Sequence, residues 1–291
     1  MLILLTLACD IERMAEAWQI DRLRVLAVAS EPAEPRPGDT VTMTSLTVSP
    51  VIPVALSTWF VCVISEELDE GCAIDPALTE NLSSVDFATL TPEEQAALYQ
   101  ELVDAGMVGV EPFFSPVWTV PLDVLDALPE EDRLEGLVAT VSITAIPDQE
   151  TVDEGDIELA YKRIPVSEAL TPNHNPVVAG LRVDGFDIAP GARVAMDRGQ
   201  TYAIELVFAD DALETYTYVN ADGVEESRVE EPYLAWYLQE GTFDQENTLY
   251  PYLTVQYTTP TDPSLTEQSL WVVVRDRRGG MAWMELPIRF L

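Results

Sequence analysis

The chain has 291 residues, of which 47% are apolar, so it can bury the cores of about two domains and is not disordered as a whole. Its 51 acidic residues outnumber its 15 basic residues, which gives a formal net charge of −36. A field of this sign repels nucleic acids and anionic lipid surfaces, and it excludes a nucleic-acid-binding function.

The N-terminus carries an uncharged apolar run, residues 2–8, that ends at Cys9 and is followed at once by Asp10. This order resembles the lipobox of bacterial lipoproteins, in which the cysteine receives a diacylglyceryl group and the preceding peptide is removed. We therefore expect a signal segment at 1–9 with Cys9 as the lipidated residue, and a tether at 10–20. The run lacks the positive n-region of a secretory signal, which indicates a natural start further upstream. A buried N-terminal strand is the alternative.

Cysteine usage fits an exported protein anchored in the cell envelope, facing the periplasm or the cell surface. No other stretch approaches the ~20 apolar residues of a transmembrane helix, so membrane contact is expected through lipid alone. The chain has 3 cysteines, and lipidation of Cys9 leaves Cys62 and Cys72 as a pair. A disulfide there would close a short loop and stabilise the fold by about 2–3 kcal/mol. Metal binding is the alternative, but two cysteines and one distant histidine make a poor site.

Residues 21–170 predict a first immunoglobulin-like β-sandwich. Alternating apolar residues, a Pro-Gly-Asp turn and a third strand that carries Trp59 follow the order of the A, B and C strands of that fold. The phase of the alternation changes near Ser45, which predicts a β-bulge. The strands are expected at 23–29, 40–48, 54–64, 137–146 and 157–166.

A partly helical insertion is expected within this domain at about 76–135. Thr91–Glu94 reads as a capping box with proline at the first helical position, and Gly106 is suited to end the helix. Between them, the apolar residues of 98–105 fall on one helical face. A second short helix is expected at 122–128.

Residues 171–176 contain two prolines and two asparagines, and predict a linker to a second immunoglobulin-like domain at 177–291. This domain repeats the theme of short alternating strands separated by turns. The overall expectation is an all-β protein with two sandwiches. The strands of the second are expected at 179–183, 202–208, 216–219, 234–238, 253–257, 270–274 and 281–290.

Five segments are distinctive in their order: Cys9, IDRLRVLAV at 20–28, EPAEPRPGDTV at 31–41, NPVVAGL with VDG at 175–185, and RDRRGGMAW at 275–283. In these segments the chain resembles a group of uncharacterised lipoproteins from myxobacteria, over most of its length apart from the insertion. The resemblance implies an exported lipoprotein with immunoglobulin-like domains. It supplies no catalytic residues.

The sequence offers little for catalysis. The single histidine, His174, lies between two asparagines and is expected to be a solvated linker residue. No Gly-x-Ser-x-Gly elbow and no phosphate-binding glycine motif is present, and a histidine-based zinc site is excluded by count. We therefore expect a binding or structural module without a cofactor. A hydrolase of envelope polymers, built on carboxylates hidden among the 51 acids, is the alternative.

Calcium is a second alternative, as the stiffening ion of a spacer. The oxygen-rich turns at 148–156 and 220–226 offer ligands, with Asp222 and Glu225 as weak metal candidates. Neither turn has the ligand spacing of an EF-hand, and turn chemistry alone explains these residues.

Aromatic residues gather in the second domain, and strand periodicity sends some of them outward. Trp236, Tyr237, Tyr250 and Tyr252 are the expected binding face for an envelope protein or a polysaccharide. Cross-strand aromatic pairs that only stabilise the sheet are the alternative.

Overall fold

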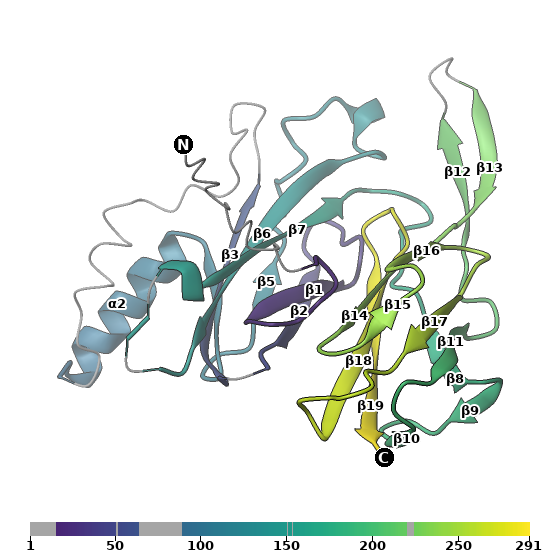
Figure 1. Ribbon diagram of the computed structural model, residues 1–291. Helices are drawn as coiled ribbons and strands as arrows, with labels where there is room; N and C mark the ends of the chain where they lie inside the picture. Colours follow the sequence, from purple (N-terminus) through teal and green to yellow (C-terminus); the bar gives the residue numbers. More distant parts are fainter. Residues whose placement is uncertain (1–15, 51, 64–88, 150, 153, 220–223) are drawn as a thin grey trace, which may run out of the picture.

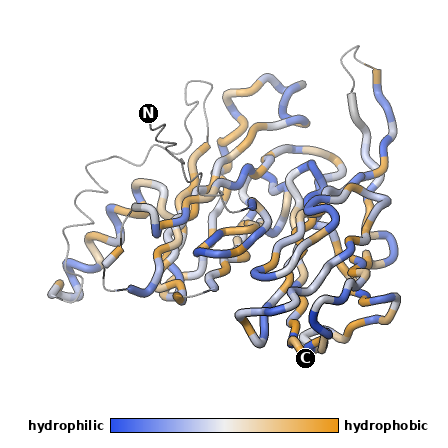
Figure 2. The backbone as a smooth tube through the Cα atoms, in the orientation of Figure 1, coloured by the Kyte–Doolittle hydropathy of each residue, from blue (hydrophilic) through white to orange (hydrophobic). Residues whose placement is uncertain are grey.

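The computed structural model describes residues 16–50, 52–63, 89–149, 151–152, 154–219 and 224–291. Cys9, Cys72 and Asp222 lie outside these residues. Almost all regular structure is β, in two sandwiches that lie side by side (Figure 1). Apolar residues lie along the strands, whereas many connections between them are hydrophilic (Figure 2). No helix in the described part of the chain has the length and apolarity needed to cross a bilayer.

The first sandwich pairs a three-stranded sheet of order β1-β2-β5 with a four-stranded sheet of order β4-β3-β6-β7. All pairings are antiparallel. In chain order the strands take the places A, B, C, C′, E, F and G of an immunoglobulin-like Greek key. Their bounds are β1 Arg24–Glu31, β2 Thr40–Val48, β3 Val54–Val63, β4 Met107–Glu111, β5 Val117–Thr119, β6 Leu137–Pro147 and β7 Glu158–Val166.

The second sandwich repeats this order. Its sheets are β10-β19-β18-β14-β16 and β15-β17-β11-β8-β9, and a separate hairpin, β12-β13, leaves the body between the B and C positions (Figure 1). Strand β10 pairs parallel to the last strand, β19, whereas the other pairings are antiparallel. The bounds are β8 Val178–Val183, β9 Phe186–Ile188, β10 Val194–Met196, β11 Thr201–Phe208, β12 Thr215–Val219, β13 Glu225–Val229, β14 Tyr233–Leu238, β15 Thr242–Phe243, β16 Asn247–Leu249, β17 Thr254–Thr258, β18 Glu267–Arg275 and β19 Met281–Phe290.

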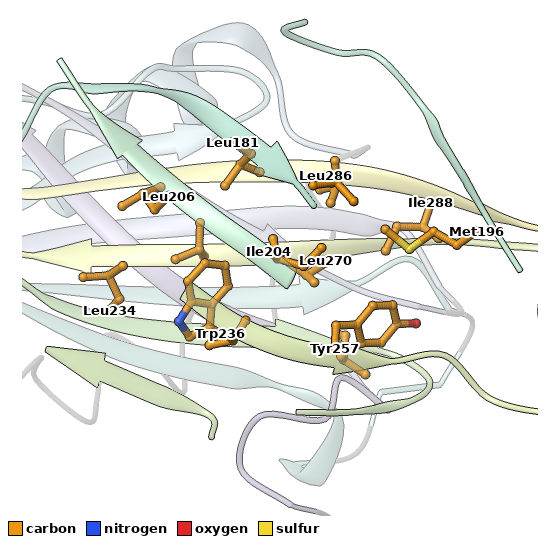
Figure 3. Packing of buried hydrophobic residues seen from close by; sticks show 14 of the residues in the cluster. Leu181, Met196, Ile204, Leu206, Leu234, Trp236, Tyr257, Leu270, Leu286 and Ile288 are labelled. Atoms are coloured by element: carbon orange, nitrogen blue, oxygen red, sulfur yellow. The ribbon is translucent and has the colours of Figure 1, made fainter. Parts of the chain in front are cut away.

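Each sandwich is centred on a tryptophan of the strand at its C position. Trp59 on β3 and Trp236 on β14 are both 0% exposed, because each lies on an inner strand and faces the opposite sheet. Their indole N–H groups are satisfied, by Glu111 Oε2 at 3.0 Å and by Thr248 Oγ1 at 3.2 Å. Figure 3 shows Trp236 among the leucine and isoleucine side chains of the second core. The prediction of two immunoglobulin-like sandwiches is confirmed by the two matching strand orders.

The expected capping-box helix is present as α2, Pro92–Asp104. Thr91 Oγ1 accepts from the Glu94 backbone and the Glu94 carboxylate accepts from the Thr91 backbone. Its apolar face covers the outer side of β3 and β4, where Leu102 packs on Phe60 and Met107. Two short 3₁₀ helices, η1 Glu130–Asp132 and η2 Glu154–Asp156, occupy loops.

Two expectations for the insertion are wrong. Residues 122–128 form successive turns instead of a helix, with Asp126 N donating to Asp123 O and Leu128 N to Leu125 O. The span 76–135 also contains β4 and β5, which belong to the two sheets of the sandwich. Short edge strands have too few residues to produce an alternating pattern, so they were hidden in the sequence.

Candidate functional site

An apolar cluster joins the two sandwiches. Strand β1 and the end of β2 pack on the outer face of β14, β18 and β19. Side chains on both faces of β18 are buried, one face in the core of the second sandwich and the other against the first sandwich. The two sandwiches are therefore packed directly against each other. The buried members of this junction cluster are Ile20, Leu26, Ala27, Val48, Trp271 and Val273, and the half-buried members are Leu46, Tyr237, Met281 and Trp283.

The predicted bulge is at this junction, but on the partner strand. Strand β2 pairs continuously near Ser45, whereas β1 skips Leu26 between Val25 and Ala27. The extra residue, Leu26, turns toward the second sandwich, and its carbonyl accepts a hydrogen bond from Arg275 Nη2 at 3.1 Å. The phase change in the sequence therefore located the irregularity and assigned it to the wrong strand.

The expected tether at 10–20 also needs correction at its end. Gln19 forms a parallel bridge with Leu238, and Ile20 N donates to Leu238 O at 2.8 Å. Trp18 lies against Phe243, with ring centroids 5.8 Å apart. Residues 18–20 are thus bound to the second sandwich before the chain enters the first: Ile20 is buried and Trp18 is half-buried, while Gln19 makes the backbone bridge.

The linker at 171–176 is tied into the junction. Asn173 is 1% exposed, and its backbone N donates to Glu34 Oε2 at 2.7 Å while its Nδ2 donates to Asp276 Oδ2 at 2.7 Å. Asn175 donates to Ser30 O and accepts from Met281 N, each at 2.8 Å. The linker asparagines therefore hydrogen-bond both sandwiches.

Two buried groups of opposite charge, Asp276 and Lys162, lie behind the linker. Asp276 is 2% exposed and accepts from the backbone N of Arg278 at 2.7 Å and of Gly279 at 2.9 Å. Lys162 of the first sandwich, 5% exposed, donates to the Gly279 carbonyl. Burial lowers the pKa of Lys162 to about 8, against the opposing effect of Asp276. Burial likewise raises the pKa of Asp276.

Arg278 extends this network toward the β12-β13 hairpin. Its guanidinium lies 3.0 Å from a carboxylate oxygen of Glu214 and 3.0 Å from one of Glu230, and 4.4 Å from the ring centroid of Tyr216. Burial raises the pKa of Glu230. His174 is exposed, as expected, and its Nδ1 lies 2.5 Å from Glu214 Oε1. The network fixes the base of the hairpin to the junction.

Beside the apolar cluster the two sandwiches leave a cleft of about 470 Å³, here called the junction cleft. One wall is the end of β2 and the residues after it, including Leu46, Val48 and Pro50. The floor is the outer face of β18 and β19, including Trp271 and Pro287. Its volume falls in the range of small-ligand sites. Its walls come from both domains, and ligand sites often lie at such domain interfaces.

The rim of the junction cleft is acidic. Glu267 is paired with Arg193, with 2.6 Å between Nη1 and Oε1. Glu285 accepts from Ser269 Oγ at 2.5 Å through Oε1. Two carboxylates and one guanidinium leave the rim with a formal charge of about −1 at neutral pH. This rim was missed from the sequence, because it is assembled from the solvent-facing positions of three separate segments.

The expected aromatic face does not exist as one surface. Trp236 is fully buried, and Tyr237 packs in the junction. Tyr250 is half-buried, and of the four only Tyr252, 74% exposed, is open to solvent. The residues share a region of sequence but point to the core, the junction and the surface.

The remaining predicted sites are only partly described. Cys62 lies half-buried on β3, whereas Cys9 and Cys72 lie outside the described residues, so lipidation and the disulfide stay predictions. Glu225 begins β13 and is exposed, and Asp222 lies outside the described residues. Among the residues that the structure describes, no three His, Cys, Asp or Glu side chains gather as a metal site would need.

No protein-family model and no curated protein sequence matches the chain. Solved structures that align include fibronectin(III)-like modules of Clostridium thermocellum CbhA, with a TM-score of 0.23, 9% identity and coverage of 91% of this chain and 94% of that one. Murine CEACAM1b aligns with a TM-score of 0.24, 8% identity and coverage of 93% and 99%. Dimeric latent PorU from Porphyromonas gingivalis gives 0.21, 9%, 93% and 24%. Scores this low carry no argument, so the fold assignment rests on the strand orders.

Proposed function

We propose that this protein is a rigid two-domain binding module of the bacterial cell envelope, tethered through a lipid on Cys9, that holds its partner in the junction cleft. The observation that carries the proposal is the cleft itself, whose walls come from two sandwiches. A cleft between domains keeps its shape only if the domains are fixed. Here an apolar cluster and a buried polar network together supply that rigidity.

The chemistry of the cleft favours binding over catalysis. Its described lining includes no histidine, cysteine or lysine. Glu267 and Glu285 are engaged by Arg193 and Ser269, which holds them as fixed acceptors of hydrogen bonds. Fixed acceptors beside apolar side chains suit recognition. The Ser269 hydroxyl in this lining holds Glu285, and no histidine or lysine of the lining is there to activate it.

The proposed location in the cell envelope depends on lipidation of Cys9, which can be tested directly. A lipid on Cys9 would place the chain outside the cytoplasm, where a disulfide between Cys62 and Cys72 can form. Replacement of Cys9 by serine should abolish labelling with an alkynyl palmitate analogue and release the protein from membranes. Retained labelling in Cys9→Ser would refute lipidation at this residue.

Photocrosslinking in the cells that produce the protein tests the cleft. Benzoylphenylalanine at Thr47, on the wall of the cleft, should give a discrete adduct when irradiated in intact envelopes. The matched control is the same residue at Phe186, which is 74% exposed on the edge strand β9 of the other sheet. Equal adducts at both positions, or none at Thr47, would contradict a partner in the cleft.

A further inference from the structure

We infer that the junction cleft binds a basic side chain, lysine or arginine, presented by an extended segment of a partner protein. The inference deepens the proposed function and rests on it. It is supported by the apolar residues of the floor, the negative charge of the rim and the negative net charge of the whole molecule. Each of these points to an alkyl chain that ends in a cation.

The floor and wall of the cleft suit a thin apolar stem. The apolar lining comes from Leu46, Val48 and Pro50 of the first sandwich and from Trp271 and Pro287 of the second, around a space of about 470 Å³. Leu46, Val48 and Trp271 also pack in the junction cluster, so they line the cleft at its edge with that cluster. Lysine and arginine bury their methylene stems on such surfaces and keep the charged head near water.

The rim supplies the acceptors for that head. Glu285 receives the Ser269 hydroxyl on one carboxylate oxygen, and Glu267 receives Arg193 on one of its oxygens. Each carboxylate thus keeps a second oxygen whose lone pairs an ammonium or guanidinium can use. The net charge of −36 adds a long-range field that attracts a basic partner and speeds its approach.

The same geometry disfavours a polysaccharide. Sugar recognition by tryptophan needs an open ring face, and Trp271 is only 8% exposed because the junction cluster covers it. Tyr252, an exposed tyrosine of the second domain, does not line the cleft. A stacked sugar ring therefore has no platform here.

The test uses the full chain and two probes, measured by titration calorimetry at about 0.15 M salt. The first probe is the acetylated, amidated peptide Leu-Lys-Pro-Lys-Leu, and the second is an oligomer of N-acetylglucosamine. Wild-type protein should bind the peptide and not the sugar. Thr47→Trp, which fills the cleft, should abolish binding, and Glu285→Gln should weaken it about tenfold while Ser269 keeps its acceptor.

Glu205→Gln is the matched control, because Glu205 lies on β11 in the other sheet and pairs with Arg182. This variant should bind the peptide as wild type does. Equal loss in Glu205→Gln and Glu285→Gln would show diffuse charge attraction and overturn the inference. Absence of peptide binding would overturn it too. Sugar binding that Thr47→Trp abolishes would overturn the basic ligand while keeping the cleft as a site, so the two proposals fail separately.

Discussion

Lys162 is a charged residue at a strand position that faces the core of the first sandwich. It shares a face of β7 with Ala160 and Ile164, which contribute to the first core, yet it is 5% exposed and carries an ammonium group. Strand β7 lies close to β1 in this sandwich, and the ammonium group of Lys162 reaches the Gly279 carbonyl of the second sandwich. A buried cation of this kind is costly unless its partners stay in place.

The unfolding free energy should therefore rise with pH above 8. The pKa of Lys162 is about 8 when folded and 10.5 as its ordinary value, so the unfolded chain binds more protons between these values. From pH 8 to pH 10 the gain should be about 2 kcal/mol, measured by urea unfolding. Lys162→Met should remove this rise. Because Lys162 is the single lysine of the chain, an unchanged slope in the variant would contradict the assignment.

At the scale of the element, strand β18 shows what the sequence could and could not reveal. Leu270, Val272 and Val274 face the core, as alternation predicts, whereas Trp271 and Val273 on the other side face the first sandwich. Two apolar faces on one strand indicate cover on both sides, and that signal for the junction was present in the sequence. It cannot say which segment provides the cover, because cover is a property of tertiary packing.

Features set by local sequence were predictable, whereas features set by tertiary packing were not. The α2 helix was predictable because its capping box is local chemistry at Thr91 and Glu94. The aromatic face was not, because a period of two sorts Trp236 from Tyr237 without saying that one side is core and the other junction. The acidic cleft rim required the two sandwiches to be docked, which no local pattern encodes.

Placing a charge in the junction should uncouple the sandwiches. In Val273→Asp a carboxylate would replace a side chain that is 0% exposed. Because an unpaired buried charge is costly, the junction should open so that the carboxylate becomes hydrated. Thermal unfolding should split into two transitions, and protease should cleave near 171–176. Val229→Asp, at a position 54% exposed on β13, is the control and should unfold as wild type does. One unsplit transition in Val273→Asp would refute coupling through this cluster.

At the scale of the molecule, two sandwiches of like strand order share a chain of net charge −36, and two of its acids, Asp276 and Glu230, are each 2% exposed. Asp276 and Glu230 both have a raised pKa because of burial. A carboxyl whose pKa is higher in the folded state holds its proton more tightly there, so stability falls as pH rises above about 4. Self-repulsion among the surface acids acts in the same direction.

The melting temperature should therefore be higher at pH 5 than at pH 7.5 in low salt, which is the reverse of a protein held together by ordinary carboxylate salt bridges. High salt screens the repulsion among exposed acids and should narrow the difference, whereas the contribution of the buried acids should persist. Asp276→Asn keeps an acceptor for the backbone N–H groups of Arg278 and Gly279 and removes one buried titration. In high salt the variant should lose part of the residual pH dependence. A melting temperature that falls from pH 7.5 to pH 5 in low salt would show that exposed ion pairs outweigh both effects.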